Sequence, residues 1–368
     1  MSFTFRLAKA EDDDELRAVS YEASMSDSGL FSLGYGREPS FFHGLEIEGP
    51  FQQTGLFVDE NNRGAGTFTR TIRPLFVNGE MQDLGYIANA RIRNEFRGST
   101  ITARAYKELK KLHADGRCPY YLSTILEGNV AVRKLLTSKR ATLPAYHEVG
   151  RITCYAILLG RKVPVPSSVK IQKGSKELLP EIVDCLNRNN RRKQFGLCWS
   201  EEDFAKENNL TRGLQVEDFL VAFRDGKVCG VVSKWDQRTF KQMTVQRFSF
   251  SMKCVKWLWD TVMPWSGYVA LPNVGDSFDI FFCATPAVDN DNKEVFQALL
   301  HTMVNENGGG DYLCCVAGFC DGDPLATVAS SLLNFSYASR LYVVCWDDGE
   351  EAFQALENRI PYVEAATL

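Results

Sequence analysis

Apolar and polar positions along this chain change period from one segment to the next. Residues 84–92, LGYIANARI, form a mostly apolar run with strand character. From residue 101 the apolar positions recur at helical spacing, with Ser99 or Thr100 as the candidate N-cap. Residues 84–111 therefore predict a strand, a tight loop at Arg97–Gly98 and a helix.

The segments before and after this unit extend the pattern to a complete α/β domain. Strands are predicted at residues 3–7, 56–58, 65–73, 120–126 and 146–159, and helices follow the acidic run 11–15 and Asn129. Residues 24–40, rich in serine and glycine, are expected to form a loop, a candidate cover for a substrate cleft.

The proline- and serine-containing segment 163–168, VPVPSS, is predicted to be a linker, after which the pattern repeats. In the second half, strands are predicted at 169–172, 219–223, 228–235, 278–284 and 312–317, and helices at 176–189 and 293–304. We therefore expect two domains, residues 1–163 and 164–368, the second a diverged copy of the first.

The loop at Arg97–Gly98 is a candidate phosphate site, because the N-terminus of a helix presents unpaired N–H groups and favours negative charge. At this junction the chain resembles the GNAT superfamily of CoA-dependent N-acyltransferases, whose pyrophosphate loop reads Q/R-x-x-G-x-G/A. Arg97 and Gly98 match its common R-G opening. The resemblance implies an α/β (α+β) fold of two tandem GNAT-like domains, each with a mixed, mostly antiparallel twisted sheet flanked by helices.

The same resemblance implies a cofactor site for acetyl-CoA or another acyl-CoA, with no metal. It assigns pantetheine to the backbone of the central strand and pyrophosphate to the loop. Asn129 matches an asparagine that often contacts the CoA arm, and it is equally well explained as a plain N-cap. The implied cofactor-binding residues are Ala90, Arg91, Ile92, Arg97, Gly98, Ser99, Thr100, Ile101, Thr102 and Asn129.

Two departures from the family pattern bear on activity. Thr100 and Thr102 stand where the loop normally has small residues, and Leu136 stands where the family has the tyrosine that protonates the departing thiolate. In the second half, the corresponding loop, residues 287–292, carries Asp289 and Asp291 and no arginine. Because these carboxylates would repel a pyrophosphate, the first half is the one expected to bind CoA if only one half does.

Three residues are candidate catalytic groups. Asp83, at the start of the central strand, is a possible base, or else a turn residue of the hairpin before it. Glu127 follows the next strand near the expected cofactor arm, and it alternatively supports a helix N-terminus. Tyr146 enters the last strand and could face the cleft.

Composition narrows the class of partner and the compartment. The 368-residue chain has a net charge of -4, which gives no general attraction to nucleic acid or to an anionic membrane. It has 11 scattered cysteines, four separated histidines and no apolar signal segment. We therefore expect a cytoplasmic protein without a metal site, and the GNAT resemblance implies a small-molecule or peptide amine as its acceptor.

Three functions remain open at this point. The first is an acetyl-CoA-dependent N-acyltransferase in which the amine attacks the thioester directly. The second is a non-catalytic CoA-binding or protein-interaction module, which the leucine at position 136 and the two loop threonines permit. The third is an aminoacyl or peptidyl transferase of the Fem type, which the net acidity disfavours. The acceptor and the oligomeric state are not encoded in any recognisable motif.

Overall fold

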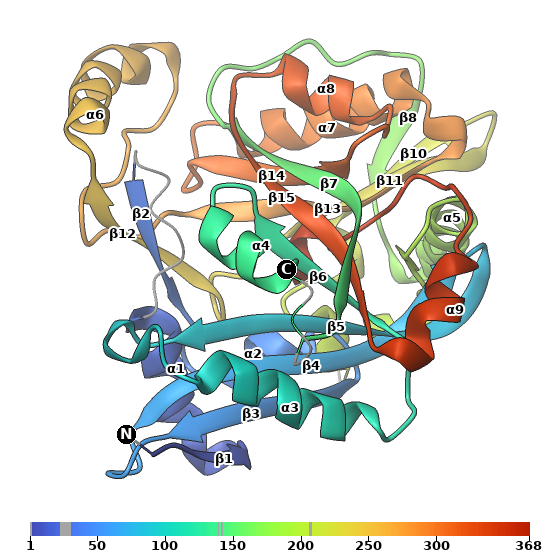
Figure 1. Ribbon diagram of the computed structural model, residues 1–368. Helices are drawn as coiled ribbons and strands as arrows, with labels where there is room; N and C mark the ends of the chain where they lie inside the picture. The colour runs from blue at the N-terminus through green and yellow to red at the C-terminus, as the bar shows by residue number, and fades with distance from the viewer. Residues whose placement is uncertain (1, 23–30, 139, 141–142, 206–207) are drawn as a thin grey trace.

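The computed structural model describes residues 2–22, 31–138, 140, 143–205 and 208–368 (Figure 1). The strands of the first half are β1 (Thr4–Leu7), β2 (Phe31–Gly36), β3 (Phe51–Val58), β4 (Gly64–Val77), β5 (Glu80–Ile92), β6 (Tyr121–Leu126) and β7 (Ala145–Leu158). Its helices are α1 (Asp13–Glu22), α2 (Phe41–Glu46), α3 (Ile101–His113) and α4 (Val130–Leu136).

The second half follows a similar order. Its strands are β8 (Lys170–Lys173), β9 (Gly196–Leu197), β10 (Phe219–Arg224), β11 (Lys227–Trp235), β12 (Gln242–Phe248), β13 (Ile280–Val288), β14 (Cys314–Cys320) and β15 (Asn334–Cys345). Its helices are α5 (Leu179–Asn190), α6 (Phe250–Val262), α7 (Lys293–Asn307), α8 (Ala326–Ser331) and α9 (Glu350–Gln354).

One large mixed sheet joins the two halves. In the described part of the chain its order is β1-β3-β4-β5-β6-β15-β7-β14-β13-β11-β10-β8, with β9 attached to β4. The last strand of each half has crossed to the other, since β15 lies between β6 and β7, and β7 lies beside β14. The division after residue 163 therefore stays a prediction about the sequence, because in space the halves share one sheet.

Helices cover both faces of each half-sheet, as alternation along the strands requires. In β3, Leu56 packs with Leu16 of α1, whereas its neighbour Phe57 packs with Leu109 of α3 on the opposite face. The second half repeats this arrangement with α5 on one face and α7 on the other. In the described part of the chain, each half thus contains one parallel pair, β5–β6 or β13–β14, connected through α3 or α7.

This architecture confirms the expected fold class, a mixed α/β fold built of two related halves.

The expected loop at 24–40 is wrong for its second part. Residues 31–36 form β2, which pairs with β12 to make a separate two-stranded sheet, and residues 24–30 lie outside the described part. Since the partner strand is about 200 residues away in sequence, local composition gave no sign of it.

We name β2, β12 and α6 the arm, because they stand beside the main sheet (Figure 1). Helix α6 was not anticipated from the sequence. In the described part of the chain, every helix is too short or too polar to cross a membrane.

Candidate functional site

The parallel strands β5 and β6 separate after a short contact, and we call the space beyond it the β5–β6 opening. Their register contains only Gly85 opposite Tyr121 and Tyr86 opposite Leu122. Beyond it, residues 88–92 of β5 are at least partly exposed although β5 lies within the sheet. Backbone groups that would complete a parallel ladder are thus available to a ligand.

Side chains hold the two strands at the start of the opening. The hydroxyl groups of Tyr86 and Thr124 lie 2.7 Å apart. On the other side, the Ser123 hydroxyl donates to the carbonyl oxygen of Ile87 over 3.1 Å. These contacts fix the point at which the strands diverge.

A β-bulge at Asn89 lies directly in the opening. Its φ is 49°, a left-handed value that asparagine tolerates better than most residues, and the β4 register shifts between Thr67 and Thr69. Asn89 Nδ2 donates to Glu48 Oε1 over 3.2 Å and to Thr69 Oγ1 over 3.1 Å. The bulge therefore ties the opening to a carboxylate from a distant segment.

Glu48 is a buried carboxylate with one oxygen atom that can accept a proton. It is 4% exposed, and its Oε2 has no hydrogen-bond partner among the described residues. Burial raises the pKa of Glu48, and the charges of Arg37 and Lys241 oppose that rise only in part. A carboxyl group of this kind can accept a proton near neutral pH.

Lys241, at the entry to β12, interacts electrostatically with Glu48. Burial lowers the pKa of Lys241, and the nearby charge of Arg37 lowers it further. Its Nζ donates to the carbonyl oxygens of Ala366 and Leu368, at 3.1 and 3.0 Å. The lysine thus links the arm, the carboxylate and the C-terminal segment.

Two arginines add positive charge beside the opening. Burial lowers the pKa of both Arg37 and Arg91, and the positive charge of Arg37 lowers the pKa of Arg91 further. The Arg91 guanidinium lies over the Tyr35 ring, 5.9 Å from its centroid. Nη1 of Arg37 is buried without a hydrogen-bond partner among the described residues. The site therefore carries more positive than negative charge.

The expected phosphate loop leads into α3 as predicted. Gly98 has a φ of 80°, and an added Cβ would meet no atom within 4 Å, so the space beside it is open. Thr100 holds the N-cap position without a side-chain bond, while Ser99 Oγ accepts from the Ile101 N–H at 3.4 Å. Arg97, Gly98 and Thr100 are exposed at the N-terminus of a 13-residue helix.

Among the described residues, the side chain hydrogen-bonded to Glu48 is that of Asn89, and none of the three predicted catalytic groups is bonded to it. Asp83 is exposed and lies opposite Pro74 of β4. It precedes Ala90 by seven positions on β5, so the two residues are about 23 Å apart along the strand. Glu127 is ion-paired with Arg151 at 3.1 Å and also with Arg340, and its hydrogen bond to Arg151 lowers its pKa. A carboxylate held in this way is a weaker base than Glu48.

The side chains of Tyr146 and Asn129 are each hydrogen-bonded to another group of the protein. The Tyr146 hydroxyl is hydrogen-bonded to that of Tyr106 in α3, and burial raises its pKa well above the usual value. Asn129 caps α4, accepting from the Val132 N–H at 3.4 Å. Leu136 is buried in the core under α3, so no hydroxyl group stands at its position. The roles of Tyr146 and Asn129 in the reaction stay predictions.

The second half has a matching opening, but the chain itself fills it. β13 and β14 pair only from Ile280 to Phe282, and Thr285 repeats the left-handed bulge with a φ of 49°. Glu364 accepts from the Thr285 N–H at 2.7 Å, and Ala365 packs against Gly318 of β14, where a Cβ would approach it to 2.7 Å. Residues 364–367 are buried there.

The acidic loop 287–292, which stands in the second half where the first has its phosphate loop, is ion-paired with basic residues of the same chain. Arg188 pairs with Asp289 at 2.8 Å, and Lys193 pairs with Asp291 at 3.2 Å. Arg192 also contacts Asp291. The basic residues that end α5 therefore neutralise this acidic loop. Two independent features, the filled opening and the paired loop, leave the first half as the candidate CoA site.

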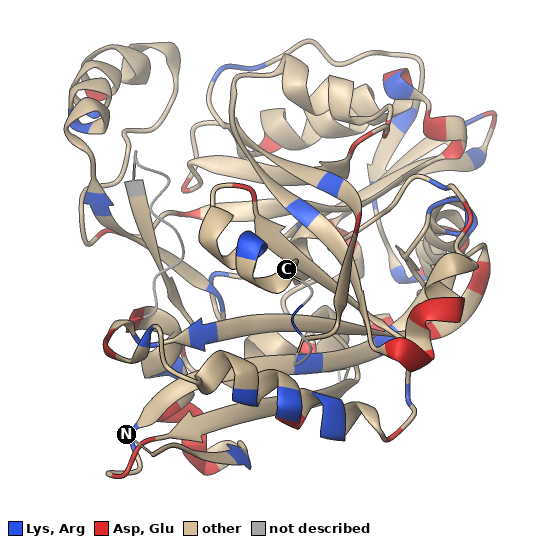
Figure 2. Cartoon of the chain, viewed as in Figure 1, with Lys and Arg blue, Asp and Glu red and all other residues tan. Residues whose placement is uncertain are grey.

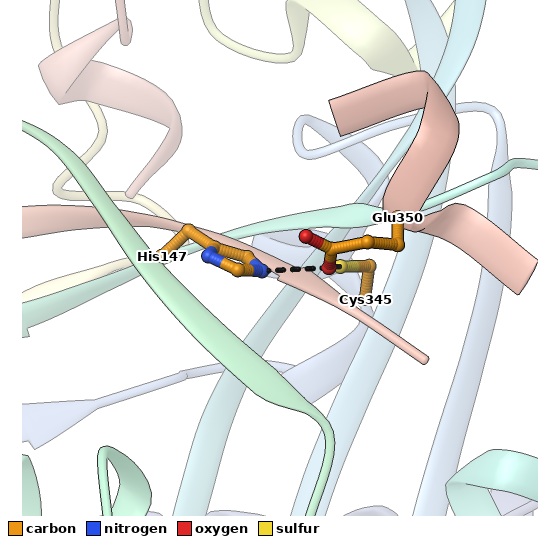
Figure 3. A group of neighbouring side chains, drawn as sticks. All are labelled: His147, Cys345 and Glu350. Atoms are coloured by element: carbon orange, nitrogen blue, oxygen red, sulfur yellow. Dashed lines mark hydrogen bonds and ion pairs between the residues drawn. The ribbon is translucent and has the colours of Figure 1, made fainter. Parts of the chain in front are cut away.

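His147, Cys345 and Glu350 form a separate cluster where β7, β15 and α9 meet (Figure 3). Their ligand-type atoms all lie within 4.8 Å of one another. His147 Nε2 is 3.0 Å from Glu350 Oε2, and the Cys345 thiol donates to the same oxygen. Burial, followed by the charge of Glu350, raises the pKa of Cys345 to about 12. The three side chains are hydrogen-bonded to one another, and these bonds hold α9 on the sheet.

Glu48, Arg37 and Lys241 were not identified from the sequence. Each stands alone in an unremarkable segment, and they meet only because β2 pairs with β12 and Asn89 reaches across to Glu48. The one available signal was the asparagine within an apolar central strand, since asparagine is depleted from strand interiors.

Comparison with family models and with curated proteins gives no match. Solved structures do match over almost the whole chain. N-myristoyltransferase from Saccharomyces cerevisiae with bound myristoyl-CoA has a TM-score of 0.57 at 12% identity, covering 93% of this chain and 82% of that one. A GCN5-related N-acetyltransferase from Sphaerobacter thermophilus has a TM-score of 0.53 at 12% identity, covering 93% and 95%.

A third match is a glucosamine N-acetyltransferase region of a fungal multi-domain β-N-acetylglucosaminidase. Its TM-score is 0.59 at 10% identity, covering 93% of this chain and 38% of that one. At these identities the likeness is one of fold. The chain has the fold of GNAT acyltransferases, and its tandem arrangement resembles that of N-myristoyltransferase.

Proposed function

We propose that this protein is an acyl-CoA-dependent N-acyltransferase, with its thioester in the β5–β6 opening and acetyl-CoA as the expected donor. The observation that carries the proposal is the bulge at Asn89. It lies where two parallel strands diverge, and it is bonded to a buried carboxylate with a raised pKa. The GNAT fold supports the reaction class. The loop from Arg97 to Thr102 would hold the pyrophosphate at the start of α3.

In the proposed reaction, Glu48 acts as the general base. The amine nitrogen attacks the thioester carbon, its proton passes to Glu48, the C–S bond breaks, and CoA leaves as a thiolate that takes a proton from water. Asn89 positions the carboxylate by its hydrogen bond to Oε1, which leaves Oε2 for the proton. Orientation of the two reactants would supply much of the rate.

The charges beside the opening favour one kind of acceptor. Arg37, Arg91 and Lys241 outnumber Glu48, and their pKa values are lowered mainly by burial. An acceptor with an anionic group beside its amine would relieve this excess of positive charge. We therefore propose a small molecule or peptide that carries a carboxylate or similar group.

The test is a calorimetric titration of acetyl-CoA and longer acyl-CoAs into the wild type and Arg97→Glu. The variant should bind roughly ten-fold more weakly or worse, a loss of about 1.4 kcal/mol, because a carboxylate would face the pyrophosphate. Arg224→Glu, an exposed charge reversal on the β10–β11 hairpin, is the matched control and should bind normally.

The outcomes separate the competing functions. Binding followed by turnover on an amine supports the acyltransferase. Retained binding without turnover on any amine of a broad panel would favour a non-catalytic CoA-binding module. Absence of binding by the wild type would overturn the proposal.

A further inference from the structure

Helix α6 and the turn after it carry the three most exposed large apolar side chains in the described part of the chain, together with three others. The exposed fractions are 83% for Phe250, 47% for Val255, 72% for Trp257, 57% for Leu258, 50% for Val262 and 91% for Trp265. Single exposed apolar residues are ordinary, but a contiguous group of this size indicates a surface that meets an apolar partner.

The exposed residues follow one side of the helix. Phe250, Cys254, Leu258 and Val262 are four residues apart, with Trp257 beside them, so they form a stripe. The opposite side is packed. Met252 is buried, and Trp259 Nε1 donates to the Val269 carbonyl oxygen at 3.0 Å. The helix is therefore held by its packed side, and its apolar stripe is exposed. Figure 1 shows α6 at the end of the arm, beside the main sheet.

Positive charge accompanies this apolar stripe. Between residues 247 and 262 the charged residues are Arg247, Lys253, Lys256 and Asp260, a net charge of +2 in a chain of net charge -4. Lys253 is exposed one turn before Trp257, whereas Lys256 is paired with Asp260 at 2.6 Å. Figure 2 shows basic as well as acidic residues on α6 and a basic residue on β12, far from the acidic residues on α9.

We propose that α6 docks the protein on the surface of an anionic lipid bilayer. The helix would lie in the interface, with Trp257 and Trp265 among the headgroups and Lys253 at the level of the phosphates. Tryptophan with apolar neighbours on one side and lysine beside them is the pattern of interfacial helices. At 13 residues the helix is about 20 Å long, too short to span a bilayer.

Charge decides between a bilayer and a second copy of this chain. Two arms placed stripe to stripe would bring like charges together, whereas anionic lipid adds about 1 kcal/mol of attraction for each basic residue near the surface. The sequence-based expectation that no membrane is involved came from the net charge of the whole chain. That average conceals a basic, apolar helix on a separate arm.

The test is flotation of the purified protein with phosphatidylcholine vesicles and with vesicles containing one third phosphatidylglycerol. The wild type should float with the anionic vesicles at least about ten-fold better than with the neutral ones. Binding should weaken with added salt, and tryptophan emission should shift to the blue. The double variant Trp257→Glu, Trp265→Glu should remain unbound while its thermal unfolding and acyl-CoA titration stay unchanged, since both side chains are exposed.

Met81→Glu is the matched control, because Met81 is 64% exposed on β5, outside the arm. This variant should float like the wild type. Equal or absent flotation of the wild type with both vesicle types would overturn the proposal. So would light scattering that shows a wild-type dimer which the double variant loses. Neither result depends on whether the protein transfers acyl groups.

Discussion

Asn89 of β5 donates a hydrogen bond to Oε1 of Glu48, a residue 41 positions earlier in the chain. The bond links the one left-handed residue in the β5–β6 opening to a carboxylate that is 4% exposed. It leaves Oε2 of that carboxylate unbonded. Both the backbone shape and the base of the proposed reaction therefore depend on this pair.

Replacing Glu48 with glutamine should abolish most acyl transfer. The amide keeps the volume and can still accept from Asn89, but it cannot take a proton, so kcat should fall by about 100-fold or more. Affinity for acyl-CoA, measured by calorimetry, should be unchanged. Glu127→Gln is the control, since Glu127 is held by Arg151, and it should keep near-normal kcat. A fully active Glu48→Gln enzyme would remove Glu48 from the mechanism.

The pH dependence of the rate should reflect the raised pKa of Glu48. The carboxylate form is the base, and burial raises the pKa above the usual 4.5, so the rate should increase with pH well above that value. The measurement is kcat/KM against pH with acceptor amines of different basicity. If the pH at which kcat/KM rises changes with the pKa of the acceptor amine, the enzyme group Glu48 does not limit the rate.

Arg37→Gln should weaken binding of acceptors that carry an anionic group. The guanidinium has a buried Nη1 without a partner among the described residues, and its charge is only partly balanced by Glu48. We expect KM for an anionic acceptor to rise about ten-fold with little change for a neutral amine of similar size. Steady-state kinetics on matched amine pairs make this measurement, and equal effects on both amines would contradict it.

Glu364→Ala should destabilise the fold without affecting cofactor binding. Glu364 is 3% exposed, and it accepts from the Thr285 N–H at 2.7 Å and from the Tyr362 hydroxyl at 2.6 Å. Losing these bonds should lower the free energy of unfolding by about 2–4 kcal/mol. Both this variant and the wild type should bind one acyl-CoA per chain. Exposed Glu357→Ala serves as the control for urea unfolding. A second acyl-CoA molecule bound to the wild type would show that residues 364–367 do not block the opening between β13 and β14.

Asp115→Asn should destabilise the protein in a pH-dependent way. Arg70 is buried, and both its terminal nitrogens donate to Asp115, at 2.8 and 2.7 Å. Removing the charge should cost about 3 kcal/mol at pH 7. The hydrogen bond to Arg70 lowers the pKa of Asp115 below 3.8, so this stability is present above the unfolded pKa and is lost as pH falls through the folded one. Unfolding curves of both proteins should converge in acid.

The local pattern was enough to predict much of the fold. The strand–loop–helix unit at residues 84–111 and the strands at 219–223 and 228–235 are encoded by neighbouring residues, and all are present. The strand exchange was not predictable, because β7 and β15 read as ordinary strands whatever their partners. Glu48 was missed for the same reason, since its burial arises from segments far apart in sequence. Helix α6 was missed because apolar residues stand on both its packed and its exposed sides, which blurs the helical period.

The crossed strands have a consequence for synthesis of the chain. During translation the first half emerges with β6 lacking its later neighbour, and that edge stays open until β15 has been made, more than 200 residues afterwards. Folding of the proposed acyl-CoA site is thereby coupled to completion of the second half, through contacts of very high sequence separation. Residues 1–163 produced alone would expose the edges of β6 and β7 and should aggregate, whereas co-expression with residues 164–368 would let each fragment supply the other's missing strand.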